Sequence, residues 1–134
     1  MKLLRNNFKL LVVAGDKVNT DQVGLAFRLQ PSGDDPTGDY QQTFELHAVL
    51  SMKGEPDKQG VRAKLQTSMD KEHWIDVVET ARLTENTTRA QTRQGGQTLL
   101  TWVRAVTELQ GVTKPAHTAT VWLVSDGPFR CRLE

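Results

Sequence analysis

The residues of this chain that are best suited to chemistry gather in one short polar segment. Ser68, Asp70 and His73 lie within a few positions of one another, and a serine, an acid and a histidine can together form a hydrolytic triad. A triad needs an imidazole held between the hydroxyl and the carboxylate, with its members supplied by separate parts of a scaffold. Three residues of a single turn do not meet that requirement, so we predict no catalytic residues and a protein that is not an enzyme.

Motifs for metals and cofactors are also weak. Three histidines are present, none at metal-ligand spacing, and we expect them at the surface or at an interface: His47, His73 and His117. Asp34, Asp35 and Asp39 could gather around a calcium ion, but their spacing does not match an EF-hand loop. Their Pro- and Gly-rich surroundings are typical of a solvated turn. We therefore predict no metal site and no cofactor.

The single cysteine, Cys131, alternates with Arg130 and Arg132. Alternate side chains of an extended chain point to opposite faces, so we expect Cys131 in the core with Phe129 and Leu133. The two arginines then point to solvent, where we assign them to an interaction surface. One cysteine allows no intrachain disulfide, which is typical of a protein made in a reducing compartment.

The segment before the polar turn has the pattern of a strand with one buried face. Its alternating residues are, on the apolar side, Val61, Ala63 and Leu65 and, on the polar side, Arg62, Lys64 and Gln66. A period of two indicates an extended chain. Residues 68–73 then form the tip, and residues 74–78 form the return strand.

Similar patterns recur along the whole chain. Strands are expected at 8–14, 23–30, 44–52, 99–109, 118–125 and 129–134, with a short strand and a loop within 81–97. We predict an all-β fold, an antiparallel, jelly-roll-like β-sandwich of about eight strands, with a small closed barrel as the alternative. The 134 residues suit one sandwich domain over 8–134, preceded by an N-terminal arm at 1–7.

Charge and hydropathy exclude two classes of partner. The 17 basic and 16 acidic residues give a net charge of +1, whereas nucleic-acid binding is usually accompanied by a basic excess. The longest uncharged apolar run, residues 10–15, is too short to span a membrane. We therefore predict neither a nucleic acid nor a membrane as partner.

Several motifs follow one another in an order that a known family shares. Ser68, Asp70 and Trp74 form a spaced tip motif, Trp102 and Arg104 an aromatic-x-Arg strand, and residues 111–115 a Gly- and Pro-containing turn. Over residues 44–124 this order resembles a β-sandwich domain of structural proteins from tailed bacteriophages and prophages. The chain departs from the family at Lys71, where a glycine is usual. A glycine tolerates a left-handed backbone, so Lys71 predicts a strained or altered tip.

The resemblance implies a non-enzymatic virion structural protein. The first expectation is a capsid decoration (cement) protein that binds and stabilises the outer shell, and the alternative is a tail-associated subunit. It further implies the major capsid protein or another virion protein as partner. A homo-oligomer, with a trimer favoured, would be assembled in the bacterial cytoplasm and located in the virion.

The three tryptophans and the N-terminal arm are candidates for the contact surface. We expect Trp74 and Trp102 in the core. Trp122 is exposed if residues 119, 121 and 123 form the buried face, and buried if they do not. An exposed Trp122 would anchor an interface or, paired with Trp102, form a sugar platform in a carbohydrate-binding module. The arm is expected to dock on a partner through two basic and two apolar residues: Lys2, Leu3, Leu4 and Arg5.

Overall fold

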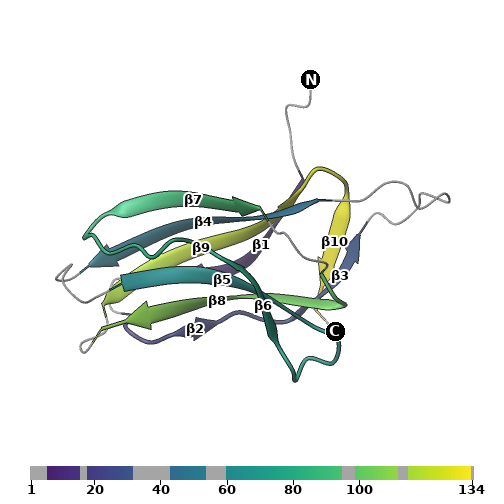
Figure 1. Ribbon diagram of the computed structural model, residues 1–134, viewed down its shortest axis with the longest axis horizontal. Helices are drawn as coiled ribbons and strands as arrows, with labels where there is room; N and C mark the ends of the chain where they lie inside the picture. The colour runs from purple at the N-terminus through teal and green to yellow at the C-terminus, as the bar shows by residue number, and fades with distance from the viewer. Residues whose placement is uncertain are drawn as a thin grey trace.

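Two β-sheets packed face to face form the molecule (Figure 1). The computed structural model describes residues 6–15, 18–31, 43–53, 60–94, 99–111 and 115–133. These residues contain ten strands and no helix, and every strand pair is antiparallel. The prediction of an all-β antiparallel sandwich is confirmed, in place of a closed barrel, and its jelly-roll character stays a prediction.

Sheet 1 has four strands and is the upper layer in Figure 1. In spatial order they are β1 (Asn6–Val13), β9 (Ala116–Ser125), β4 (Phe44–Lys53) and β7 (Thr88–Gln94). The two central strands, β4 and β9, pair over ten consecutive positions. Such long pairing holds their side chains in a defined register.

Sheet 2 has six strands. Its path runs through β10 (Phe129–Arg132), β3 (Phe27–Pro31), β8 (Trp102–Gln110), β5 (Gly60–Ser68) and β6 (Ile75–Glu79), and β2 (Gln22–Val23) pairs with β8. The β3–β10 pair turns across one end of the sandwich (Figure 1). That end therefore presents a surface of its own.

The core forms where the inward faces of β4, β9, β5 and β8 meet. Its most buried members are Leu46, Leu50, Met52, Val61, Ala63, Leu65, Val103, Ala105, Val121 and Leu123. Each of these strands contributes every second residue, as the period of two requires. Burial of aliphatic side chains on both inner faces is the main force that holds the sheets together.

The strand expected at residues 23–30 is interrupted. β2 ends at Val23 and β3 begins at Phe27. At Gly24 the backbone N–H donates to the carbonyl of Ala105 at 2.7 Å, and a Cβ there would lie only 2.8 Å from the same oxygen. The chain passes so close to β8 that only glycine fits, and the alternating pattern across this point does not reveal the break.

The boundary expected between arm and domain lies too far along the chain. β1 begins at Asn6 and pairs with β9 from that residue onward, so Asn6 and Asn7 belong to the sandwich. β1 is also an edge strand, and Val12 is 53% exposed on it. The predicted arm residues Lys2, Leu3, Leu4 and Arg5 lie outside the described residues.

His117 is buried between the two sheets, so its prediction as a surface residue is wrong. Its Nδ1 lies 3.0 Å from the carbonyl oxygen of Val18, and its Nε2 lies 2.9 Å from Oγ1 of Thr107 on β8. A carbonyl can only accept, so Nδ1 carries the proton and Nε2 accepts from the threonine hydroxyl. That hydroxyl accepts in turn from the N–H of Gln22 at 3.1 Å. The neutral ring thus links sheet 1 to sheet 2.

The environment of Cys131 confirms the prediction only in part. Cys131 and Phe129 are half-buried beside the core, where the Phe129 ring packs edge-on against Phe44 with centroids 5.5 Å apart. Burial raises the pKa of the Cys131 thiol to about 12. Leu133, predicted to be buried with them, is 60% exposed because it lies beyond the end of β10.

Candidate interaction surface

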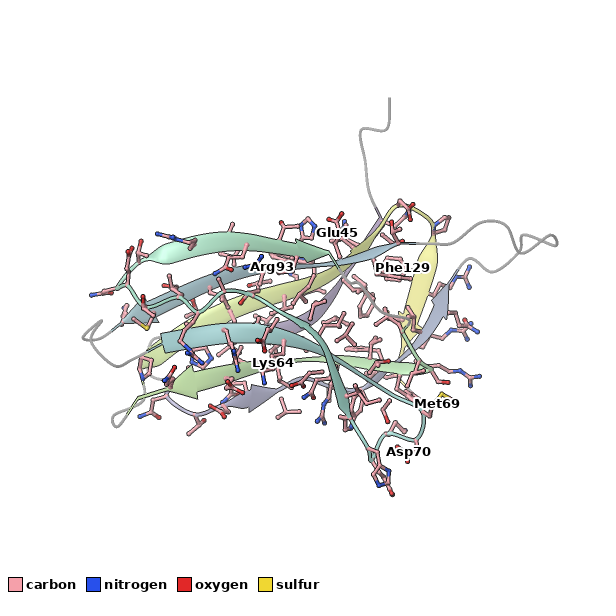
Figure 2. The ribbon with its side chains drawn as sticks, viewed as in Figure 1. Glu45, Lys64, Met69, Asp70, Arg93 and Phe129 are labelled. Carbon is pink, nitrogen blue, oxygen red and sulfur yellow. The ribbon has the colours of Figure 1, made fainter. Side chains whose placement is uncertain are left out.

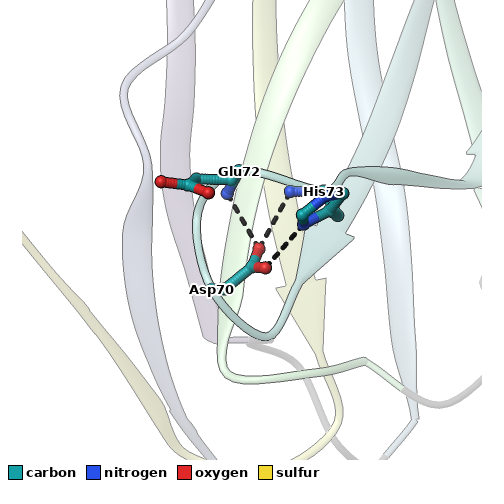
Figure 3. Close-up of side chains that lie close together, drawn as sticks. All are labelled: Asp70, Glu72 and His73. Atoms are coloured by element: carbon teal, nitrogen blue, oxygen red, sulfur yellow. Dashed lines mark hydrogen bonds and ion pairs between the residues drawn. The ribbon is translucent and has the colours of Figure 1, made fainter.

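The polar tip between β5 and β6 is a closed network of short hydrogen bonds (Figure 3). Ser68 Oγ accepts from the N–H groups of Asp70 and Lys71 at 3.1 and 3.0 Å and donates to Asp70 Oδ1 at 3.0 Å. The same Oδ1 accepts from the N–H groups of Glu72 and His73, both at 2.9 Å. These bonds replace the backbone ladder that the chain gives up as it turns.

The order of groups in the tip does not suit a hydrolytic triad. Asp70 Oδ2 lies 2.7 Å from Nδ1 of His73, so the carboxylate stands between the hydroxyl and the imidazole. Ser68 is fully buried. The imidazole is therefore not placed to take the serine proton.

Asp70, Glu72 and His73 also bring three possible metal-ligand atoms within 4.8 Å of one another. Both Asp70 oxygens already accept hydrogen bonds, which hold the pKa of this carboxyl well below its ordinary value, the backbone N–H of His73 contributing most. The carboxylate closes the turn, and these bonds would have to be broken to bind an ion.

Lys71 takes the left-handed conformation expected at its position, with φ of 66°. This confirms the predicted strain, since a residue with a Cβ resists that conformation by about 1–2 kcal/mol. Its Nζ lies 4.3 Å from the centroid of the Trp102 ring. A cation above an aromatic face recovers part of that cost.

Trp74 and Trp102 are not core residues, contrary to prediction. The inward face of β8 carries Val103 and Ala105, so Trp102 and Arg104 point outward. The Arg104 guanidinium lies 4.1 Å from the centroid of the Trp74 ring. The outer surface of sheet 2 is thus covered by cation–aromatic pairs at its tip end.

The outer surface of sheet 2 over β5, β6 and β8 also carries a balanced ion network. Its members are the cations Arg62, Lys64 and Arg82 and the carboxylates Asp76, Glu79 and Glu108. Lys64 Nζ lies 2.8 Å from Glu108 and 3.2 Å from Asp76. Arg62 lies 2.6 Å from Glu108 and 3.1 Å from Glu79. Lys64, labelled in Figure 2, lies over the centre of β5, and its side chain is only 12% exposed.

Hydrogen bonds on this surface shift the pKa values of Lys64, Glu108 and Asp76. The hydrogen bond to Glu108 raises the pKa of Lys64. The hydrogen bond from Lys64 lowers the pKa of Glu108, and the hydrogen bond from Gln66 lowers that of Asp76. All three shifts favour the charged forms. The charges of this face are therefore satisfied within the chain.

The outer surface of sheet 1 has a different character. Ala119, Val121 and Leu123 form the buried side of β9, so Trp122 points outward. Cross-strand pairing places Val12, Thr120, Val49 and Ala90 in one row across all four strands. The next row consists of Lys9, Trp122, His47 and Thr92, and the row on the other side contains Thr118, Ser51 and Thr88. We call these three rows the Trp122 face.

Charge is confined to the margin of the Trp122 face. Lys9 lies on the edge strand β1, and Glu45 lies at one end, 2.9 Å from Nε2 of His47. The central row contains only apolar residues and a threonine, and its Val49 is 36% exposed. A partner that covers the central row removes no charged side chain from water.

The structure separates the residues that the sequence assigned to one interface. Trp122 lies on sheet 1, whereas Arg130 and Arg132 are exposed on β10 of sheet 2. Trp122 and Trp102 also lie on different sheets, each pointing outward, so they cannot form one sugar platform.

Sequence reasoning missed Val12 and Val49 as neighbours of Trp122. The signal was present, since β4 carries Val49 among its polar positions, where a valine has no structural role in the core.

Comparison with known proteins does not assign this chain to a family. No family model matches the chain, and no curated protein matches it either. Among the described residues, no helix is long and apolar enough to cross a membrane.

Proposed function

We propose that this chain is a non-enzymatic structural protein that docks on another protein through the Trp122 face. The observation that carries the proposal is the outer surface of sheet 1, where a half-buried tryptophan lies next to a central row of valine, threonine and alanine, with Lys9 and Glu45 at the margin. Tryptophan is among the residues that contribute most to binding energy at interfaces. Depletion of charge around it lowers the cost of desolvation.

The size of the face implies binding by many copies together. Four strands about 4.8 Å apart and five residues of about 3.4 Å each give an area on the order of 300 Å². A stable interface usually buries about 800 Å² on each partner. One copy would therefore bind weakly, and an array of copies on a repeating surface would bind strongly.

A repeating surface of this kind is the outer shell of a virus particle. The phage-like order of motifs over residues 44–124 supports a virion as the location, and a capsid decoration protein is the role we propose. The major shell protein would be the partner, and the protein itself would form a trimer. Its contribution would be mechanical, because many modest contacts together resist pressure from inside the shell.

Co-sedimentation tests this proposal directly. Particles produced by a strain that lacks the gene for this chain are mixed with the purified protein and pelleted. We expect saturable binding, with a fixed number of copies on each particle. Absence of the protein from the pellet at saturating concentration would refute the proposal. Light scattering after size-exclusion chromatography tests the trimer separately, and a monomer in solution and on the particle would contradict it.

A further inference from the structure

A hollow of about 400 Å³ lies at the tip end of sheet 2, apart from the Trp122 face. Its walls are the tip and the residues that lead into β8. Met69 and Asp70, both labelled in Figure 2, mark its place. We call it the tip hollow, and six residues line it: Met69, Asp70, His73, Trp74, Ile75 and Leu100.

Hydrogen bonds hold the walls of the tip hollow in place. The N–H of Leu100 donates at 2.8 Å to Oγ1 of Thr67, near the end of β5. The hydroxyl of Thr101 donates to the sulfur of Met69 at 3.7 Å. These bonds tie the residues that precede β8 to the end of β5 and to the tip. The hollow is therefore formed within one chain, and such preorganisation lowers the cost of binding.

The lining of the tip hollow is largely apolar. Met69 is 65% exposed and Ile75 is 54% exposed, and both lie together with Trp74 and Leu100 rather than singly. Exposed apolar side chains that gather in one place are typical of a contact site. Methionine, which is unbranched and flexible, also adapts its shape to a partner.

Acidic side chains lie at the rim of the tip hollow. The Asp70 carboxylate lies 2.7 Å from Nδ1 of His73. The Glu72 carboxylate is exposed within 4.8 Å of both groups, and among the described residues it forms no ion pair. The tip hollow therefore suits a segment that carries an aliphatic side chain and, close to it, a positive charge.

We propose that the tip hollow binds residues 2–5 of a second copy of this chain, which we call the arm segment. Its sequence is Lys-Leu-Leu-Arg. Alternate side chains of an extended peptide point to opposite sides, so each side of a bound arm segment presents one leucine and one cation. The leucine matches the apolar lining, and the cation matches Glu72 at the rim.

The distance across the sandwich assigns the arm segment to another copy. Asn6 lies on β1, at one edge of sheet 1, whereas Ile75 lies on β6, at the edge of sheet 2 beside β7. Three strand spacings of about 4.8 Å and one sheet spacing of about 10 Å give a separation of about 17 Å. Leu3, three residues before Asn6, reaches at most about 10 Å from it. This reach is well short of the tip hollow of the same chain.

Such a contact joins two unlike surfaces, so every copy offers both an arm segment and a tip hollow. Head-to-tail contacts of this kind close into rings when the rotation between copies permits. The inference rests on the homo-oligomer proposed above, and the trimer would be a ring of three such contacts. It uses no residue of the Trp122 face. Particles that bind the chain while the tip hollow binds no arm segment would refute this inference alone.

Disulfide cross-linking of the full chain tests the proposal in the absence of particles. Leu4→Cys and Ile75→Cys are purified as separate variants, mixed in equal amounts and oxidised with copper phenanthroline. We expect a covalent dimer with one copy of each variant, identified by the mass of its disulfide-linked peptides. The parent chain measures the background from Cys131, which should react slowly because burial raises the pKa of its thiol to about 12.

Val12→Cys takes the place of Ile75→Cys in the matched control, because Val12 is 53% exposed and Ile75 54%. Leu4→Cys should link to Ile75→Cys at least about fivefold more than to Val12→Cys, since binding raises the effective concentration of the two thiols. Addition of Glu72→Lys to the Ile75→Cys variant reverses the charge at the rim and should lower the linkage about threefold. Circular dichroism confirms that all variants are folded.

Four results would overturn the proposal. Equal linkage to Val12→Cys would indicate random collision, and unchanged linkage with Glu72→Lys would contradict recognition of the cation. Absence of any mixed dimer at high protein concentration would exclude a second copy as the partner. Linkage within single chains of a Leu4→Cys, Ile75→Cys double variant, without mixed dimers of the single variants, would assign the tip hollow to the arm segment of its own chain.

Discussion

The outer surfaces of the two sheets are built by the same alternation of side chains but differ in chemistry. On sheet 2, Lys64 and Arg62 are surrounded by carboxylates within 2.6–3.2 Å. On sheet 1, Val49 lies in a row without charged residues, and the only charged cross-strand neighbour of Trp122 among the described residues is Lys9 on the edge strand. A face whose charges are paired internally loses those pairings or their hydration when it is covered, whereas a neutral face loses little. The difference supports the proposal that a protein partner covers sheet 1.

Replacement of His117, which links the two sheets, should have the largest effect on the free energy of unfolding. His117→Ala removes a buried side chain and leaves the Thr107 hydroxyl and the Val18 carbonyl without a partner from the ring. We expect a loss of about 2–4 kcal/mol in the free energy of unfolding, measured by urea denaturation. His47→Ala, on the exposed side of sheet 1, is the control and should change stability by less than about 0.5 kcal/mol. Equal effects of the two substitutions would contradict the role of His117.

The next largest effect on stability should come from the ion network on sheet 2. The same substitution on the outer surface of sheet 1 should have little effect. Lys64→Met removes the cation that lies 3.2 Å from Asp76 and 2.8 Å from Glu108, and we expect a loss of about 1–2 kcal/mol in urea denaturation. Lys9→Met on sheet 1 makes the same chemical change and should stay within about 0.5 kcal/mol of the parent chain. If both lysines prove equally replaceable, the ion network does not stabilise sheet 2.

Mild acid should act first on the link between the layers. Burial holds the pKa of His117 below its ordinary value of 6.5, so the folded state binds fewer protons than the unfolded state. The stability that this ring contributes is complete above pH 6.5 and falls as the pH drops below that value. Urea midpoints recorded from about pH 7 to about pH 5 should fall in the parent chain and fall less in His117→Gln. A flat profile in the parent chain would count against a neutral buried ring.

Stronger acid should then act on sheet 2. The pKa values of Glu108 and Asp76 are held below their ordinary 4.5 and 3.8 by hydrogen bonds from Lys64 and Gln66, respectively. Their contribution is therefore complete above about pH 4.5 and is lost as the pH falls through their lowered values. A second fall in the urea midpoint should appear below about pH 4.5 and be smaller in Glu108→Gln. The same second fall in both proteins would show that other carboxylates cause it.

The smallest effect concerns the tip. Lys71→Gly relieves the strain of the left-handed backbone but loses the contact with Trp102. These two contributions to the free energy of unfolding should nearly cancel. Lys71→Ala loses the contact and keeps the strain. We expect the glycine variant to be more stable than the alanine variant by about 1 kcal/mol. Identical midpoints would mean that the backbone at this position is not strained.

The strands could be predicted from sequence where the two faces of a strand differ clearly. β4 and β5 alternate cleanly, so their bounds and buried sides follow from the pattern. β8 misleads because its outward residues Trp102 and Val106 are as apolar as its inward ones, and the cation over the Trp102 ring, Lys71, comes from elsewhere in the chain. The burial of His117 depends on partners ten and 99 residues away. Such contacts leave no local signature.

The candidate surface could be predicted only as far as Trp122. The sequence alone does not show which side of β9 is buried, and the prediction of Trp122 as an interface anchor depends on this. The structure shows that Trp122 lies on the outward side. Val12 and Val49 join it through strand pairing between residues far apart in sequence. Arg28 and Arg132 meet in the same way, across β3 and β10.

The most direct test of docking through sheet 1 compares two tryptophans of similar burial on opposite layers. Trp122→Ala and Trp102→Ala are purified alongside the parent chain, and each is titrated against particles produced without this protein. We expect Trp122→Ala to bind at least about tenfold more weakly, since interface anchors contribute about 2 kcal/mol or more, and Trp102→Ala to bind like the parent chain. Undiminished binding of Trp122→Ala, or an equal loss in both variants, would contradict docking through the Trp122 face.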